Sequence, residues 1–214
     1  MKIEIGESLL LSYLKHVKKC VLYQTNWKAS SRWDKSSKAE EEYKIIEQTD
    51  FKDAFKQGFN QLMKQSEIDA IGMNFNNKII YACDIAFHTF GLQYGDTDES
   101  TNRVLKKLLR TYLTLIRYFP DYEYEILFAS PKVYPAVENR IIPIIENLNN
   151  LFSNKRVKFF CYLNDDFKDN ILNETMVAAK NDSDTNELFI RSMILNELSN
   201  THKNGEADSR KVEA

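Results

Sequence analysis

The sequence has few of the residues that break or cross-link a chain. Its 214 residues include four prolines, six glycines and three cysteines. Scarce proline and glycine favour long regular elements and few tight turns. Cys20, Cys83 and Cys161 are odd in number and form no C-x-x-C pair, which is typical of reduced thiols in a cytoplasmic protein and indicates no zinc site.

Long hydrophobic runs are missing too. The N-terminal segment carries only three consecutive leucines before charged residues resume, and no other segment approaches the roughly 20 apolar residues of a membrane span. We therefore expect a cytoplasmic protein with no signal peptide and no membrane partner. Because the formal net charge is −2, any nucleic-acid surface would have to be a local basic stripe.

Common catalytic motifs are also missing. The chain has no glycine-rich phosphate loop, no G-x-S-x-G turn and no H-E-x-x-H pair. The three histidines are His16, His88 and His202. A Ser-His-Asp site would depend almost wholly on His88, so the sequence disfavours that chemistry.

The periodicity of apolar residues predicts an α/β protein with one domain over residues 1–198. Helices are predicted for 7–19, 51–64, 101–118, 135–152 and 184–198, and strands for 67–75, 78–85, 124–130 and 157–163. Residues 22–50 are rich in polar residues and predict a long loop or insertion with some helix near 39–47. The polar segment 199–214 predicts a disordered tail. Strands that alternate with helices after a hairpin imply a mixed sheet with helices packed on it.

Two aspartates occupy unusual positions in the expected hairpin. If Asn76 and Asn77 form a two-residue turn, paired residue numbers sum to about 153, and Asp69 lies opposite Asp84. The two carboxylates would repel each other on an otherwise apolar face, which is costly without a partner. A shared Mg²⁺ or Mn²⁺, which takes oxygen ligands, would relieve that repulsion. The alternative is a register slipped by one residue, or an aspartate at an exposed strand end.

The acidic residues resemble a known set. The set consists of an acidic residue on an early strand, a second about fifteen positions later and a glutamate on the N-terminal helix. It resembles the acidic residues of the PD-(D/E)xK nuclease superfamily. The resemblance covers roughly residues 3–163 and implies a restriction-endonuclease-like fold, with a mixed central sheet flanked by helices and opened by a β-hairpin. It implies that Asp69 and Asp84 bind the metal. Glu7, in "IGESLL", and the carbonyl of Ile85 would add further metal contacts.

The chain departs from the family pattern two residues after Asp84, where Ala86 takes the place of the lysine. Some members of the superfamily carry this lysine on the following helix, where "NRVLKKLLR" offers Lys106 and Lys107. The lysine would orient the attacking water. His88 is a second candidate, because positions 84, 86 and 88 share a face if the strand continues; a packed or capping histidine is the alternative.

The activity implied by the resemblance is hydrolysis of phosphodiester bonds by a metal-dependent endonuclease. The expected substrate is nucleic acid, with DNA favoured over RNA. The expected cofactor is Mg²⁺ or Mn²⁺. A basic face on the 101–118 helix would bind the substrate, formed by Arg103, Lys106, Arg110 and Arg117. An ordinary solvated face is the alternative. The sequence leaves the oligomeric state open. A homodimer would agree with the resemblance, since restriction-like nucleases often dimerise to cut two strands.

Two other functions are compatible with the sequence. A nuclease-like fold without catalysis would serve as a nucleic-acid or protein-binding module, and Ala86 favours it. An amine of Lys106 or Lys107 inside the carboxylate pair would argue against it. A plain α/β interaction protein would instead keep Asp69 and Asp84 apart or solvated.

Two tryptophans, Trp27 and Trp33, lie in a polar stretch with Lys28 and Arg32. We favour the interpretation that they pin a long loop to the core. The alternative is that they stack on bases, as aromatic residues do in single-strand-binding proteins.

Overall fold

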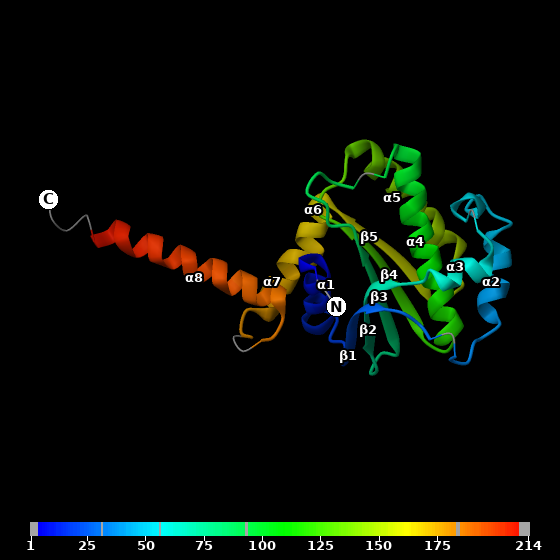
Figure 1. Cartoon of the computed structure of the whole chain (residues 1–214), viewed down its shortest axis with the longest axis horizontal. Helices are drawn as coiled ribbons and strands as arrows, with labels where there is room; N and C mark the ends of the chain where they lie inside the picture. The colour runs from blue at the N-terminus through cyan, green and yellow to red at the C-terminus, as the bar shows by residue number, and fades with distance from the viewer. Residues whose placement is uncertain (1–3, 31, 56, 93, 183–184, 210–214) are drawn as a thin grey trace.

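The computed structural model describes residues 4–30, 32–55, 57–92, 94–182 and 185–209. Its centre is a five-stranded sheet in the order β1-β2-β3-β4-β5 (Figure 1). The strands are β1 (Leu22–Trp27), β2 (Ile68–Asn74), β3 (Ile79–Ile85), β4 (Glu123–Ser130) and β5 (Val157–Leu163). The first three strands are antiparallel, and β4 and β5 continue parallel to β3. The prediction of an α/β protein with a mixed sheet is confirmed.

Helices cover both faces of this sheet (Figure 1). One face carries α1 (Ile5–His16), α6 (Asn164–Phe167), the π-helical turn η2 (Lys168–Asn173) and α7 (Glu174–Ala179). The other carries α2 (Lys38–Ile46), the short 3₁₀ turn η1 (Lys52–Ala54), α3 (Phe59–Lys64), α4 (Thr97–Tyr118) and α5 (Pro135–Leu151). The last helix, α8 (Leu188–Ser209), begins against α1 and then extends away from the rest of the molecule (Figure 1).

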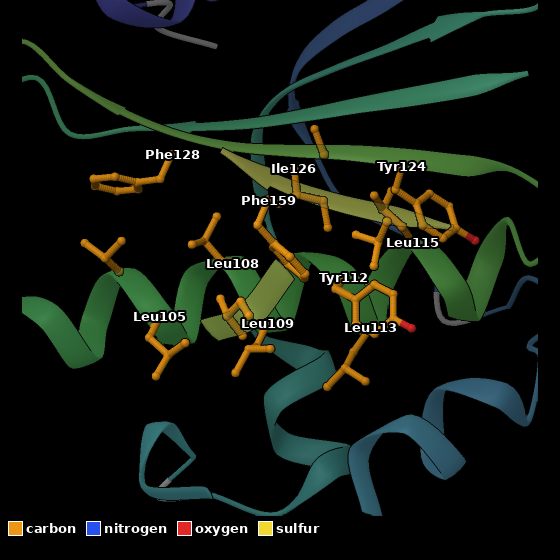
Figure 2. Packing of buried hydrophobic residues seen from close by; sticks show 14 of the residues in the cluster. Leu105, Leu108, Leu109, Tyr112, Leu113, Leu115, Tyr124, Ile126, Phe128 and Phe159 are labelled. Carbon is orange, nitrogen blue, oxygen red and sulfur yellow. The ribbon is translucent and has the colours of Figure 1, made fainter. Parts of the chain in front are cut away.

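Helix α4 is fixed against the sheet by its apolar face. This face is buried, and it includes Val104, Leu105, Leu108, Leu109, Tyr112 and Ile116. Figure 2 shows α4 leucines and Tyr112 gathered with Phe128 of β4 and Phe159 of β5. Each buried leucine contributes about 2 kcal/mol through removal of apolar surface from water. This packing sets the rotation of α4, and therefore the direction of its polar side chains.

The hairpin has the predicted register but a different turn. Ala70 pairs with Cys83 and Ile71 with Ala82, so paired numbers sum to 153. The turn spans four residues, 75–78, and Asn76 and Asn77 do not have the positive φ of a type I′ turn. Instead the side chain of Asn74 accepts hydrogen bonds from both backbone amides. The register survives because the longer turn is centred on the same point.

Two segments differ from the sequence-based expectation. The stretch 22–50 contains the helix expected near 39–47, as α2, but it also contains a strand that was not expected, because residues 22–27 form β1 and pair with β2. This edge strand was missed because only Thr25 and Trp27 of its side chains are buried. The single helix expected over 51–64 is broken into η1 and α3 by an extended Phe55 and by Gly58, a poor helix former that precedes α3.

The C-terminal segment is more helical than the sequence predicted. Helix α8 starts at Leu188 and continues to Ser209, so it enters the segment 199–214 expected as a tail, of which 210–214 lie outside the described residues. No helix in the described ranges is both long enough and apolar enough to span a membrane.

Candidate active site

The two aspartates meet at one end of the hairpin. Asp69 directly precedes the Ala70–Cys83 pair, so the register places it opposite Asp84. Asp84 is 1% exposed, whereas the side chain of Asp69 is 21% exposed. The Oδ2 atom of Asp69 accepts a hydrogen bond from the backbone N–H of Ile85 at 2.9 Å. The expectation that the two carboxylates face each other on the α4 side of the sheet agrees with this geometry.

Lys107 of α4 places its amine between the two carboxylates. Its Nζ atom lies 3.2 Å from Oδ1 of Asp84 and 3.4 Å from Oδ2 of Asp69. One turn later on the same helix, Thr111 donates a hydrogen bond from Oγ1 to Oδ2 of Asp84 at 3.1 Å. We call Asp69, Asp84, Lys107 and Thr111 the α4 cluster. Both Lys106 and Lys107 were candidates from sequence, and the structure brings Lys107 to the carboxylates.

In the α4 cluster two carboxylates face a single positively charged side chain, that of Lys107. Burial, and then the facing Asp84, raise the pKa of Asp69 above its ordinary value. Lys107 and the Ile85 amide oppose this rise without cancelling it. Burial by itself would lower the pKa of Lys107, but the two aspartates outweigh it and raise that pKa. Lys107 therefore stays protonated, and one ammonium is shared by two carboxylates.

The donor set fits a hard cation that keeps some of its water. Mg²⁺ is commonly held by one or two carboxylates plus substrate phosphates, and both aspartates offer oxygen atoms at the sheet end. A bound divalent ion would also remove the repulsion that raises the pKa of Asp69. The residues present are thus compatible with the predicted Mg²⁺ or Mn²⁺ at Asp69 and Asp84.

Glu7 is linked to the α4 cluster only indirectly, through a hydrogen bond with Asn26. Asn26 donates a hydrogen bond from Nδ2 to Oε2 of Glu7 at 2.8 Å. The pairing of Thr25 with Ala70 and of Trp27 with Ile68 places Asn26 beside Asp69, where its φ of 52° departs from regular strand geometry. Among the described residues, the carboxylate of Glu7 does not join Asp69 and Asp84 in a set of ligand atoms that all lie within 4.8 Å of one another.

The other predicted site residues are arranged differently from the expectation. Strand β3 ends at Ile85, so the alternation that would bring His88 to the face of Asp84 does not continue. The exposed His88 ring instead meets the edge of Tyr94, with centroids 6.0 Å apart. Ile85 contributes its amide to Asp69, and the role of its carbonyl as a metal contact stays a prediction.

A cavity of about 690 Å³ adjoins Lys107 on α4. Its basic lining includes Arg103, Lys106 and Arg110, three of the four residues predicted to bind nucleic acid. Its acidic lining consists of Asp53, Asp96, Asp98 and Glu99. Arg103 pairs with Glu99 at 2.6 Å and stacks on Tyr94, so part of the predicted positive charge is neutralised.

A second group of ionisable residues lies on the opposite side of the sheet. His16 Nε2 lies 3.0 Å from Oε2 of Glu187 and 3.7 Å from Oδ2 of Asp182. Lys15 Nζ lies 2.5 Å from Glu187 and 3.4 Å from Asp182. We call these four residues the α1 cluster. The ligand atoms of His16, Asp182 and Glu187 lie close enough together to hold a metal, and Lys15 supplies a cation to both carboxylates, as Lys107 does in the α4 cluster.

Sequence reasoning missed two contributors to the site. Thr111 lies on α4, and nothing in the sequence around it distinguishes it from any other threonine in a helix. Asn26 lies in β1, a strand that the sequence did not indicate. The only available signal was the spacing of four between Lys107 and Thr111, which places two residues on one helix face.

Comparison with known proteins gives no relative for this chain. No family model, curated protein or solved structure matches it. The interpretation of the α4 cluster therefore rests on its own geometry.

Proposed function

We propose that the protein is a metal-dependent nuclease that hydrolyses phosphodiester bonds of nucleic acid, DNA before RNA. The observation that carries the proposal is the amine of Lys107 between Asp69 and Asp84. Two facing carboxylates and a lysine from the next helix are the three groups that the resemblance to the PD-(D/E)xK superfamily requires. Ala86, in the usual position of the lysine, is then compensated by a residue from α4.

The order of the elements supports a restriction-endonuclease-like fold. The core of that fold has the succession helix, hairpin, helix, strand, helix, strand. The structure has α1, the β2–β3 hairpin, α4, β4, α5 and β5 in that succession. Strand β1 extends the hairpin into a three-stranded antiparallel unit, and β4 follows parallel to β3. The site lies where the hairpin and α4 meet.

In the proposed reaction the chain's own residues bind, orient and neutralise. Asp69 and Asp84 would hold a divalent ion, which when bound would supply Lewis-acid activation of water and of the phosphate. Thr111 holds Asp84 in position through its hydroxyl. Lys107 keeps its proton and would stabilise the negative charge that develops on the phosphoryl oxygens as water attacks phosphorus and one P–O bond breaks. The attacking water would lose a proton to solvent, and the leaving oxygen would take one up from solvent.

A non-catalytic binding module is the second candidate. One observation favours it: Lys107 already serves as an internal counter-ion for both carboxylates, as in a purely structural ion cluster. In that case the lysine would stabilise the fold, removal of either aspartate would change stability, and the wild type would not cleave nucleic acid.

The test is a cleavage assay on end-labelled single-stranded DNA, duplex DNA and RNA with Mg²⁺, Mn²⁺ or EDTA. We expect cleavage by the wild type with a divalent ion, and a loss of about a hundredfold or more in Asp84→Asn and Lys107→Met. Glu187→Gln makes the same charge change as Asp84→Asn in the α1 cluster and serves as the matched control. Equal cleavage by all four proteins, or none by the wild type, would refute the nuclease and leave the binding module.

A further inference from the structure

A second cavity, of about 500 Å³, lies near the C-terminal end of α4. Its walls come from the chain just after β1, from the segment before α2, from α3 and from the last turn of α4. The basic residues in these walls are Lys28, Lys35, Lys64 and Arg117. None of the described residues that line it is acidic, in contrast to the cavity beside Lys107. We call this cavity the Arg117 pocket.

The cations of the Arg117 pocket are poorly neutralised by the protein. Lys28 pairs with Glu67 at 2.7 Å, but both side chains are more than a third exposed, so the pair contributes little. Within the part of the chain that the structure describes, no carboxylate pairs with Lys35 or Lys64. The pocket therefore presents a local positive potential on a protein whose net charge is −2.

Among the residues that line the pocket, Arg117 has a hydrogen-bond donor that is not satisfied by the described residues. Its guanidinium lies 5.1 Å from the centroid of Phe59 and 6.0 Å from that of Tyr118, which fixes its plane. Its Nη1 atom is buried and has no hydrogen-bond partner among the residues that the structure describes. An unsatisfied buried donor costs free energy, and arginine is well suited to hydrogen-bond phosphate oxygens. Arg117 also lines the pocket, so the positive charge of its guanidinium would attract a phosphate there.

An exposed tryptophan packs against Tyr118, which lines the same pocket. Trp33 is 48% exposed, and its ring centroid lies 5.9 Å from that of Tyr118 in an edge-to-face arrangement. Trp27 is buried beneath it at 6.0 Å. Trp27 thus pins the segment, as the sequence suggested, whereas Trp33 keeps a solvent-facing surface on which a planar base could stack.

We propose that the Arg117 pocket and Trp33 bind an unpaired strand of the nucleic acid. The pocket holds a backbone phosphate and Trp33 stacks on a base, which is the combination that single-strand-binding proteins use. Stacking on the indole requires a base that is not inside a duplex. Arg117 follows Lys107 by ten residues on α4, about 15 Å along the helix axis, so a strand bound here can extend along α4 to the α4 cluster.

This inference rests on the proposed function, because it names the substrate of the α4 cluster as nucleic acid with a single-stranded segment. Binding is measured separately from cleavage, by fluorescence anisotropy in EDTA. The probes are a fluorescein-labelled 15-nucleotide single strand and a duplex of the same sequence. The variants are Lys35→Gln/Lys64→Gln and Trp33→Ala. The matched control is Lys168→Gln/Lys180→Gln, which removes two exposed lysines from the opposite side of the sheet.

We expect about tenfold weaker single-strand binding in both pocket variants and unchanged binding in the control. The double lysine variant should also reduce the slope of log K against log salt by about 1.4, since each phosphate contact on a single strand contributes about 0.7. The tryptophan variant should leave that slope unchanged, because stacking releases no counterions.

Two outcomes would overturn the inference: pocket variants that bind like the control, or a duplex that binds as tightly as the single strand with no effect of Trp33→Ala. The two readouts separate this inference from the proposed function. A wild type that binds the single strand in EDTA but cleaves nothing with a divalent ion would refute the nuclease and keep this inference. A wild type that cleaves while the pocket variants bind like the control would refute this inference alone.

Discussion

The protein contains two clusters in which a lysine meets two carboxylates, and their surroundings differ. In the α1 cluster, Glu187 receives hydrogen bonds from Lys15, His16 and Thr185. Burial opposes ionisation of Glu187, but hydrogen bonds led by that from Lys15 outweigh it and lower its pKa to about 2. In the α4 cluster the balance is reversed, and the pKa of Asp69 is raised. The comparison teaches that two clusters with the same lysine and carboxylates differ in how far their carboxylates are satisfied by hydrogen bonds, and it is this difference on which the proposed metal site in the α4 cluster depends.

The largest expected effect on stability comes from removal of the lysine that the α4 cluster shares. Lys107→Met leaves Asp69 facing a buried Asp84, and loss of one partner of a buried ion pair costs about 3 kcal/mol. Since the folded-state pKa of Asp69 is raised, stability falls as the pH rises through that pKa and recovers on acidification. Urea denaturation of Lys107→Met at pH 7 and pH 4.5 should therefore show a smaller deficit at the lower pH.

The matched double variant sharpens this prediction. Lys107→Met/Asp69→Asn removes the repulsion together with the lysine, and we expect it to recover most of the stability lost at pH 7. A deficit that does not depend on pH, and that Asp69→Asn does not rescue, would mean that Lys107 stabilises the fold through packing alone.

A somewhat smaller effect is expected in the α1 cluster, with the opposite pH dependence. The pKa of Glu187 is lowered from 4.5 to about 2, so its contribution is present above the unfolded-state pKa and is lost as the pH falls through the folded-state value. Glu187→Gln should lose on the order of 2–3 kcal/mol at pH 7 and much less at pH 2.5. Guanidinium denaturation at the two pH values checks this, and an equal loss at both would contradict the assigned role of the charge.

The sequence predicted those parts of the site that depend on regular periodicity. The period of two along residues 67–85 placed Asp69 opposite Asp84, and the error in the turn did not matter because the centre of the hairpin was right. The helical spacing of the α4 leucines predicted its buried face. That face fixes the rotation of the helix, but only the packed structure shows that Lys107 reaches the carboxylates.

The parts that were missed lack a local pattern. Strand β1 is a polar edge strand with few buried side chains, so its composition resembles that of a loop. The α1 cluster joins His16 to Glu187, 171 positions away, and no sequence pattern reports such a contact. The basic face predicted on α4 was treated as one surface, whereas Arg103 and Arg117 line two different cavities with different charge.

The most direct test of the account is a thermal-shift titration with Mg²⁺ and Mn²⁺, in the presence of a single-stranded oligonucleotide, on the wild type, Asp69→Asn and Glu187→Gln. Ligand that binds the folded state raises Tm with concentration. The account predicts a metal-dependent rise in Tm for the wild type and for Glu187→Gln, and no such rise for Asp69→Asn. A rise that persists in Asp69→Asn and disappears in Glu187→Gln would move the metal to the α1 cluster and contradict the proposed active site.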